Sequence, residues 1–332
     1  MDGQTRGVEM MTILVTGGSG FMGSNYIYHL IDKNIRVINY SKETYAVHNR
    51  TLEKAEKTGL LVNIEGDILD SSKLTTTLEH YEVSHIVHFA AETHVDRSFK
   101  YPEEFMQTNF IGTFRLLEVI RHIYEGRRKP VLIHISTDEV FGDVKKGRVK
   151  ETAQLKPQNP YSASKAAIES LLYAWRTAYG LDIRIIRPTN NYGARQHPEK
   201  LIAKVITRCL TNRPYTLWKG DATRNWLYVE DLCNAIDIVM EKGKSGEAYN
   251  VSSSDDLTVS QINATITKLM HKEDLFRGYE GQRLKLDQRY ALNCDKIREL
   301  GWKQQWNFET AILDVIEWYR KNSWFWKGVW SQ

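Results

Sequence analysis

The feature that most constrains the fold of this chain is a glycine-rich turn between a short apolar run and a helical pattern. The apolar run covers residues 13–16, and the turn that follows reads Gly-Gly-Ser-Gly-Phe-Met-Gly over residues 17–23. Glycines allow a tight turn whose N–H groups approach a phosphate, and the N-terminus of the next helix adds partial positive charge. The strand-turn-helix context therefore predicts that residues 17–23 bind the pyrophosphate of a dinucleotide.

Further contacts of this dinucleotide are expected at the ends of the following strands. An acidic residue usually ends the second strand, where it binds the ribose 2′-OH of NAD. Ser41 stands there instead and is followed by Lys42, which could tolerate a 2′-phosphate. We therefore expect NAD and leave NADP open. The expected cofactor contacts are Gly17, Gly20, Phe21, Met22, Gly23, Ser41, Asp67, Ile68 and Ala90, together with Tyr161 and Lys165.

Short β-branched runs alternate with helical patterns over the first half of the chain. Such alternation is typical of βαβ units, whose parallel sheet is covered by helices on both faces. We therefore predict an α/β fold with a Rossmann-like, doubly wound parallel sheet, which binds ligands beyond the carboxyl ends of its strands. The expected strands are residues 13–16, 37–40, 62–65, 85–89, 131–136 and 183–187, and the clearest helices are 103–125 and 161–179.

The pattern changes after about residue 190, where strand signals become sparse and loops with proline and glycine separate the helices. Thr258 and Gln261 form a capping box that predicts a helix to about Met270, and a last helix is expected over residues 308–319. We expect a smaller, mixed α/β lobe that binds the substrate. The predicted division is a disordered leader at 1–11, a dinucleotide-binding Rossmann domain at 12–190 and this lobe at 191–332.

Composition excludes several classes of protein. Hydrophobic residues make up 42% and charged residues 26% of the chain, as in an ordinary globular protein, and the formal charge is +4. The basic residues form no long stripe, so we expect no nucleic-acid partner. No signal peptide and no run of about 20 apolar residues is present, so we expect a soluble, cytoplasmic protein without a membrane partner. Three scattered cysteines and ten histidines without metal-ligand spacing predict no metal site.

Two further motifs carry chemistry. Tyr161 and Lys165 lie four residues apart at the start of a helix, so the ammonium can sit near the phenol and favour the phenolate. Thr137, Asp138 and Glu139 follow a predicted strand. Adjacent carboxylates at a strand end are unusual because like charges repel, and they indicate an acid–base pair whose environments separate the two pKa values.

These motifs and several others resemble the dTDP-glucose 4,6-dehydratase family, in that family's order and from about residue 13 to residue 326. The resemblance implies a hydro-lyase of the extended short-chain dehydrogenase/reductase class, which converts UDP-glucose or dTDP-glucose into the 4-keto-6-deoxy sugar and water, for deoxysugar synthesis of the rhamnose type. STDEVFG discriminates best, because related 4-epimerases and decarboxylases do not keep the Asp-Glu pair. The matching segments are TGGSGFMG, HFAAETHVDRSF, TNFIGT, STDEVFG, PYSASK, NNYGARQHPEKLI, RNWLYVED and DQRYAL.

The resemblance assigns a role to each of the five catalytic candidates. Tyr161, helped by Lys165, would take the proton of the sugar 4-OH while hydride passes from C4 to the nicotinamide, and Thr137 would hydrogen-bond the same oxygen. Glu139 would remove the C5 proton, and a protonated Asp138 would donate to the departing 6-OH. Hydride would then return to C6, so that the tightly bound cofactor need never leave.

The resemblance also implies substrate contacts and an assembly. The lobe at 191–332 would bind the nucleotide sugar, with Arg224 and Arg289 at the pyrophosphate because a guanidinium pairs well with phosphate oxygens. Asn109 would fix the backbone near the site, and two long helices of each subunit would pair in a homodimer. The expected substrate-binding residues are Thr93, Asn191, Lys200, Leu201, Arg224 and Arg289.

Departures from the family pattern leave alternatives open. Besides Ser41, Leu286 stands where the family's usual RPGHDRRY segment has histidine, and Ala222-Thr223 replace Asn-Val before the arginine. DQRY and the Trp-rich C-terminus resemble the UDP-glucose 4,6-dehydratase domains of rhamnose synthesis, which slightly favours UDP over dTDP. The alternative functions are a UDP-sugar 4-epimerase or decarboxylase and a non-catalytic NAD(P)-sensing protein.

Overall fold

The computed structural model describes residues 11–281 and 287–329 of the chain. Two sequence-based predictions therefore fall outside the described residues. These are the leader, except for its last residue, and the departure at Leu286.

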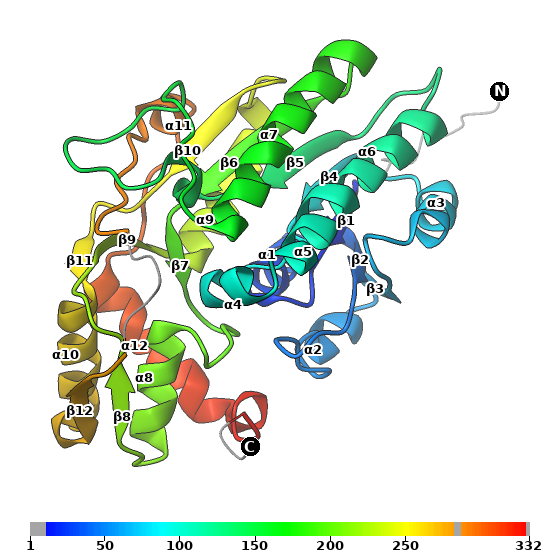
Figure 1. Ribbon diagram of the computed structural model, residues 1–332. Coiled ribbons are helices and arrows are strands. Elements are labelled where there is room, and N and C mark those ends of the chain that lie inside the picture. Colours follow the sequence, from blue (N-terminus) through cyan, green and yellow to red (C-terminus); the bar gives the residue numbers. More distant parts are fainter. Residues whose placement is uncertain (1–10, 282–286, 330–332) are drawn as a thin grey trace.

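Seven parallel strands form the main sheet, in the order β10-β6-β5-β4-β1-β2-β3 (Figure 1). The strand order reverses between β1 and β4, which creates the crevice at the carboxyl edge where ligands bind in folds of this kind. The six strands predicted from the sequence are all present. The strands are β1 (Thr12–Thr16), β2 (Arg36–Ser41), β3 (Leu61–Glu65), β4 (His85–His88), β5 (Val131–Ile135), β6 (Ile183–Pro188) and β10 (Ala248–Val251).

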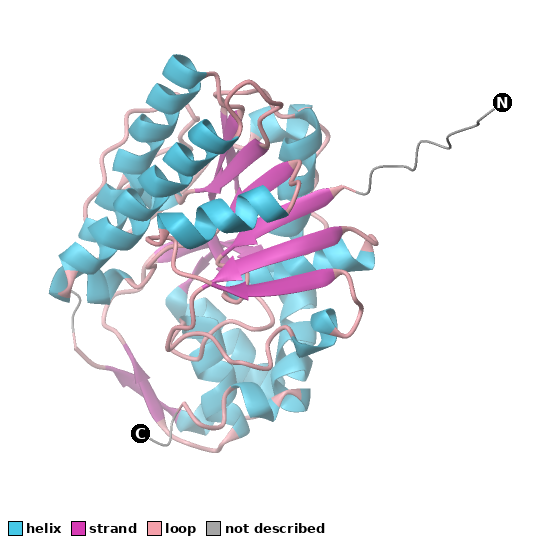
Figure 2. Ribbon diagram, turned by 90° about the vertical axis from the view of Figure 1, so that its right-hand side faces the viewer, coloured by secondary structure: helices cyan, strands magenta, loops and turns pink. Residues whose placement is uncertain are grey.

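Helices cover both faces of this sheet (Figure 2). Alternate residues of β1 show why: Ile13 and Val15 pack against α1 and α9, whereas Leu14 packs toward α3, α6 and α7 on the opposite face. A strand buried on both faces is apolar along its central positions, which is the pattern of residues 13–15 between the buried threonines at the two ends of β1. The covering helices are α1 (Phe21–Asp32), α3 (Ser71–His80), α6 (Gly112–Ile123), α7 (Pro160–Tyr179) and α9 (Val229–Lys242).

A second hydrophobic core holds the smaller lobe beside the carboxyl edge of the main sheet (Figure 1). It is built from a three-stranded sheet, β11-β9-β7, a strand pair, β12-β8, and three helices. Its elements are β7 (Asn190–Tyr192), β8 (Tyr215–Leu217), β9 (Thr223–Tyr228), β11 (Asp256–Thr258), β12 (Phe276–Tyr279), α8 (Leu201–Leu210), α10 (Val259–Met270) and α12 (Phe308–Lys321). The remaining short helices are α2 (Glu53–Glu56), α4 (Val95–Lys100), α5 (Pro102–Phe105) and α11 (Asp295–Glu299), with a π-helix at Met106–Ile111 and 3₁₀ turns at Asp138–Phe141, Glu273–Leu275 and Ser323–Phe325.

The division of the chain into two domains near residue 190 stays a prediction. Segments from beyond residue 190 nevertheless form part of the main sheet and its helical cover. Helix α9 and strand β10 belong to the second half of the sequence, yet α9 packs on the main sheet and β10 pairs with β6. The short run of β10 carries little strand signal, because a strand of four residues at a sheet edge is specified by its neighbour rather than by its own pattern. The two parts of the fold are therefore joined through the sheet itself.

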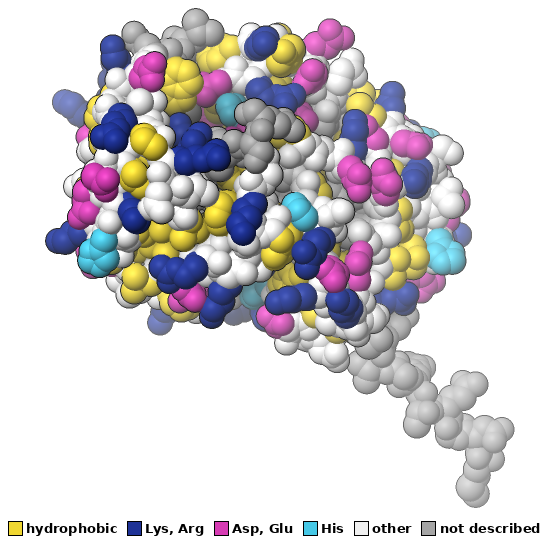
Figure 3. Space-filling view, turned by 90° about the horizontal axis from the view of Figure 1, so that it is seen from below, with side chains coloured by type: hydrophobic (Ala, Val, Ile, Leu, Met, Phe, Trp, Pro, Cys, Tyr) yellow, Lys and Arg dark blue, Asp and Glu magenta, His cyan; other side chains and the backbone are white. Residues whose placement is uncertain are grey.

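Two helix starts are fixed by side-chain caps. Thr258 and Gln261 form the predicted capping box of α10, and Asn159 with Ser162 forms an equivalent one at the start of α7. Within the part of the chain that the structure describes, no helix is both long and apolar enough to cross a membrane. On the face drawn in Figure 3, Lys and Arg side chains are spread among acidic and apolar ones instead of forming a continuous stripe.

Candidate active site

The glycine-rich turn joins β1 to α1 at the point where the strand order reverses. Gly17 has a φ of +69°, and a Cβ there would lie 2.7 Å from the backbone N of Ala90, so only glycine fits. A Cβ on Gly20 would meet nothing within 4 Å except the Gly17 carbonyl oxygen at 3.3 Å. The N-terminus of α1, where Phe21 and Met22 form the first turn, therefore faces open space, and its N–H groups have no partners within the helix.

The ends of β2 and β3 lie beside this turn. The hydroxyl of Ser41 accepts a hydrogen bond from the backbone N–H of Ser19 at 3.4 Å. The ammonium of Lys42 lies 2.7 Å from a carboxylate oxygen of Asp67, which holds the pKa of that carboxyl below its ordinary value despite partial burial. Ile68 follows and is buried against Gly112. These features fit a dinucleotide whose pyrophosphate lies on the α1 N-terminus and whose adenosine lies toward β2 and β3.

Thr137, Asp138 and Glu139 follow β5 at the same edge of the sheet. The Thr137 hydroxyl caps the short 3₁₀ turn by accepting from the Glu139 N–H at 3.3 Å, and it donates to Asp138 Oδ1 at 3.2 Å. Asp138 Oδ2 is buried and has no hydrogen-bond partner among the described residues. A buried carboxyl with only one of its oxygens hydrogen-bonded lowers the stability of the fold. Such a group calls for an explanation, and a functional role of Asp138 provides one.

The environments of the two carboxyls push them toward the protonated form by different amounts. Asp138 is 2% exposed, and burial together with the charge of Glu139 raises its pKa to about 8. Burial also raises the pKa of Glu139, but the Asn159 amide donates to its Oε2 at 3.0 Å and works against this rise. At neutral pH Asp138 therefore holds a proton that it can donate, and the hydrogen bond from Asn159 favours the carboxylate of Glu139, the form that can act as a base.

Tyr161 and Lys165 lie one turn apart on the buried face of α7, as predicted. Burial raises the pKa of Tyr161, the charge of Glu139 adds to the rise, and a hydrogen bond with Thr137 opposes it. The sequence predicts that the Lys165 ammonium favours the phenolate; in the structure the largest effect on the pKa of this phenol is desolvation, which raises it. The phenol therefore needs further positive charge near it before it can act as a base.

The ammonium of Lys165 is held by two acceptors that the sequence did not reveal. It donates to the backbone oxygen of Ile135 at 2.7 Å and approaches Nε2 of His134 at 3.2 Å. Burial lowers the pKa of Lys165 to about 7, while the carboxylate of Glu169 favours the charged form. The carboxylate of Glu169 in turn accepts hydrogen bonds from the Arg187 guanidinium and the Ser136 hydroxyl.

Among the expected substrate residues, Arg224 is brought to the carboxyl pair. Its positive charge opposes the rise in the pKa values of both Asp138 and Glu139. The guanidinium stacks on Tyr290 at 4.4 Å and donates to the carbonyl oxygen of Asp287 at 2.7 Å. The structure thus places one cation, buried and held in a fixed direction, beside the reactive carboxyls.

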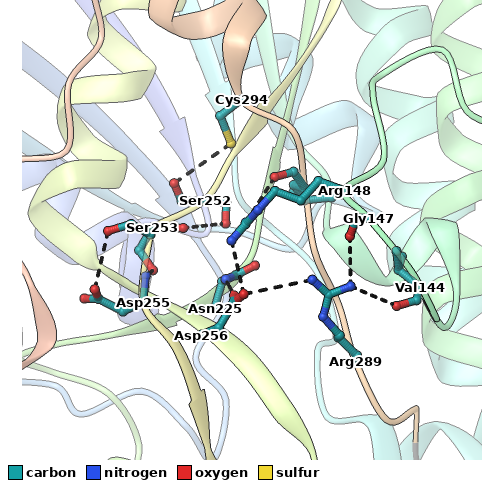
Figure 4. Close-up of polar contacts among 12 residues, drawn as sticks. Val144, Gly147, Arg148, Asn225, Ser252, Ser253, Asp255, Asp256, Arg289 and Cys294 are labelled. Carbon is teal, nitrogen blue, oxygen red and sulfur yellow. Dashed lines mark hydrogen bonds and ion pairs between the residues drawn. The ribbon is translucent and has the colours of Figure 1, made fainter.

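Arg289, the second arginine expected at the pyrophosphate, contacts other parts of the protein than Arg224 does. Its guanidinium donates to the carbonyl oxygens of Val144 and Gly147 at 3.2 and 2.8 Å, and it lies 4.0 Å from the carboxylate of Asp256 (Figure 4). Arg148 shares that carboxylate at 3.1 Å. In this conformation the contacts of Arg289 link the loop after Gly142 to β11. Its predicted contact with a pyrophosphate stays a prediction.

The other expected substrate residues lie on β7, at the start of α8 and in the loop after β4. Asn191 on β7 is buried and donates to the Thr189 carbonyl, but its Oδ1 has no partner among the described residues. Lys200 is the residue directly before α8, Leu201 is the first helical residue, and Thr93 is exposed in the loop after β4.

Asn109 sits on the π-helix between α5 and α6. It exchanges hydrogen bonds with the backbone of Glu92 and donates to the Ser164 hydroxyl at 2.9 Å. This agrees with its predicted role in fixing the backbone beside the site.

The fold and the site together define a class. A parallel sheet with a glycine turn between β1 and α1, and a Tyr-Lys pair on α7 beside polar residues after β5, is the arrangement of the extended short-chain dehydrogenases/reductases. The sequence model of the family described as GDP-mannose 4,6 dehydratase matches residues 14–315.

Known proteins narrow the class further. A probable dTDP-glucose 4,6-dehydratase of Sinorhizobium fredii is 38% identical over 96% of this chain and 95% of its own length. The dTDP-glucose 4,6-dehydratase of Salmonella typhimurium is 39% identical over 94% of each chain. The crystal structure of a dTDP-glucose 4,6-dehydratase from Streptomyces venezuelae, with NAD and TYD bound, superposes with a TM-score of 0.90 at 36% identity and covers 96% of this chain and 99% of that one. The chain belongs to the dTDP-glucose 4,6-dehydratase family, which confirms the predicted fold and family.

Proposed function

We propose that this protein is an NAD-dependent nucleotide-sugar 4,6-dehydratase, a hydro-lyase that converts an NDP-glucose into the NDP-4-keto-6-deoxy sugar and water. The observation that carries the proposal is the pair Asp138 and Glu139. One carboxyl is buried with a pKa of about 8 and an unpartnered oxygen, and the carboxylate of its neighbour is favoured by the Asn159 amide and by the charge of Arg224. Dehydration needs an acid for the leaving hydroxyl and a base for the adjacent C–H at the same time, and an epimerisation needs neither.

The cofactor site suits NAD. When bound, its nicotinamide ring would accept a hydride from C4 of the sugar and return it to C6, and its positive charge would favour the Tyr161 phenolate. The turn at residues 17–23, Ser41 and Asp67 would hold the pyrophosphate and the adenosine.

The residues of α7 and β5 act first, at the sugar C4. Tyr161 takes the proton of the 4-OH, and its phenol is close enough to Thr137 for both to contact the same oxygen. The Ile135 carbonyl oxygen and Nε2 of His134 lie at hydrogen-bond distance from the Lys165 ammonium and favour its charged form, although burial lowers its pKa to about 7.

The carboxyl pair acts next, at C5 and C6. The 4-ketone acidifies C5–H, so Glu139 removes that proton while the electrons form the C5–C6 double bond. Asp138 gives its proton to the departing 6-OH, which leaves as water. After hydride reaches C6, Glu139 returns its proton to C5. The cycle can repeat once Tyr161 has released the proton that it took from the 4-OH and Asp138 has regained one, and these two transfers balance.

The nucleotide would lie between β9, β7 and the start of α8. Arg224 offers a buried cation to the pyrophosphate, Lys200 offers a second, and Asn191 has a free acceptor for the sugar or base. The curated relatives described above are named for dTDP-glucose, and the residues of this site fit dTDP-glucose and UDP-glucose alike. The three buried, unpaired cysteines are consistent with a reducing compartment such as the cytoplasm.

The test uses NDP-glucose with deuterium at C4. The proposal predicts a dehydrated product that carries this deuterium at C6 and a solvent proton at C5, because the hydride moves within one bound complex. A C4 epimer that keeps its 6-OH, or loss of the deuterium to solvent, would contradict the proposal.

A homodimer is the assembly that we propose. Phe114 on α6 contacts Trp175 on α7, which contacts Tyr179, so these two helices share an exposed aromatic strip. Pairing with the same helices of a second copy would cover it, as the family resemblance implies. The unaltered protein should have the mass of a dimer in solution and Phe114→Glu that of a monomer, whereas a monomeric unaltered protein would contradict the assembly.

A further inference from the structure

We infer that the adenosine end of the cofactor site admits a 2′-phosphate, so that this protein binds NADP as well as NAD. The inference rests on the cofactor site of the proposed function and concerns only which dinucleotide that site holds.

The residue that normally excludes NADP is missing at this position. A carboxylate at the end of the second strand binds the 2′-OH of NAD and repels the extra phosphate of NADP. Here β2 ends with Ser41, which is 8% exposed and held in place by the Ser19 N–H. A hydroxyl both donates and accepts, so Ser41 can bond to a 2′-OH or to a phosphate oxygen without a charge penalty for either.

Hydrogen-bond donors gather around this point. The Ser41 hydroxyl accepts from Ser19 N, and the Ser19 hydroxyl accepts from the side-chain amide of Asn39 at 3.0 Å. Neither contact uses the hydroxyl hydrogen, so both hydroxyls keep a hydrogen to donate. Two hydroxyl donors beside a lysine form a set that suits a phosphate dianion better than a neutral ribose hydroxyl.

Lys42 supplies the positive charge. Its side chain is 62% exposed, and its ammonium lies 2.7 Å from Asp67 Oδ2, so it can turn toward a ligand from the solvent side. Asp67 keeps a second partner, because its Oδ1 accepts from the Leu69 N–H at 2.9 Å. Sharing Lys42 with a phosphate would therefore not leave this carboxylate unsupported.

The proposed reaction sets no preference between the two dinucleotides. The hydride that leaves C4 is returned at C6 in the same complex, so the cofactor ends each turnover as it began. The 2′-phosphate lies at the adenosine end and takes no part in this transfer.

Equilibrium competition tests the inference without a measurement of activity. The purified protein is incubated with equimolar NAD and NADP until exchange is complete and freed of unbound nucleotide by gel filtration. The protein is then denatured, and the released nucleotides are quantified by chromatography. We expect NAD and NADP in amounts that differ by less than about tenfold, because the attraction of Lys42 for the 2′-phosphate is opposed by the carboxylate of Asp67 beside it.

Two variants and a matched control complete the experiment. Ser41→Asp should raise the ratio of NAD to NADP at least about tenfold, because the new carboxylate repels the phosphate. Lys42→Gln should lower NADP uptake by about tenfold and leave NAD uptake nearly unchanged. Lys57→Gln removes another lysine that is paired with a carboxylate, directly after α2, and should change the uptake of neither nucleotide.

The outcomes separate this inference from the proposed function. A wild-type protein that retains NAD alone, or an unchanged ratio in Ser41→Asp or in Lys42→Gln, would overturn the inference and leave the dehydratase proposal standing. A protein that takes up neither nucleotide would overturn both.

Discussion

The ammonium of Lys165 lies 3.2 Å from Nε2 of His134 on β5, the strand that is followed by the reactive Thr137 and Asp138. Burial lowers the pKa of His134 and lowers that of the adjacent His88 to about 3, so both imidazoles are neutral. A neutral Nε2 next to an ammonium is an acceptor, so His134 stabilises the charged form of Lys165.

Removal of this acceptor should change the pH dependence of the reaction. In His134→Leu the charged form of Lys165 loses a hydrogen bond, so its pKa falls and the ammonium is lost at lower pH. The alkaline limb of the kcat profile should move down by about one pH unit. His134→Asn, whose amide oxygen can accept, should restore most of the profile, and an unchanged profile in a folded, nucleotide-bound His134→Leu would show that His134 only fills space.

Replacement of the acid should stop dehydration. Asp138→Asn has nearly the same shape but no proton to donate to the 6-OH, so kcat should fall by about 10²- to 10⁴-fold. In the unaltered protein the reaction should decline as pH rises from about 7 through about 8, because first Lys165 and then Asp138 lose their protons. Exchange of the C5 proton with deuterated solvent, followed by NMR, should persist in Asp138→Asn; its loss would place Asp138 at an earlier step.

The same substitution should stabilise the fold. The pKa of Asp138 is about 8 in the folded protein and near the ordinary value of about 3.9 when unfolded, so the unfolded state releases this proton first. Ionisation of Asp138 therefore favours unfolding from about pH 4 upward. Asp138→Asn should raise the free energy of unfolding by ~2–4 kcal/mol at pH 7.5, measured by urea denaturation, and the gain should vanish near pH 4. A gain that is equal at both pH values would contradict the raised pKa.

Alanine substitutions at two glycines with similar φ angles should distinguish the cost of backbone strain from the loss of cofactor binding. Gly17 has a φ of +69° with Ala90 at 2.7 Å from its added Cβ, whereas Gly126 has a φ of +70° and nothing within 4 Å. Gly126→Ala should cost only the strain of about 1 kcal/mol. Gly17→Ala should cost ~2–5 kcal/mol and lose the bound nucleotide, because the clash adds to the strain. Equal melting temperatures and nucleotide contents for the two variants would contradict the assigned role of the turn.

Local patterns predicted those parts of the site that neighbouring residues determine. The glycine turn between β1 and α1, the pair Tyr161 and Lys165 on one helix face, and the carboxyls after β5 all depend on short-range spacing. The contact of Asn159 with Glu139 was missed, although an asparagine before a proline is a recognisable helix cap.

Contacts between distant segments could not be predicted in the same way. His134 meets Lys165 only because α7 packs across β5. Arg289 points to Val144 because residues 143–149 pair with residues 288–293, and nothing in either segment alone indicates this. Burial likewise sets the pKa of Tyr161, and burial depends on the complete fold.

The most direct test of the proposed function is to incubate the purified protein, with no added cofactor, separately with dTDP-glucose and UDP-glucose and to follow the product by mass. The account predicts the loss of one water from at least one of them without net formation of NADH, and the faster substrate identifies the nucleotide. If neither substrate loses water, even after NAD and NADP are supplied, the roles proposed for Asp138 and Glu139 are wrong.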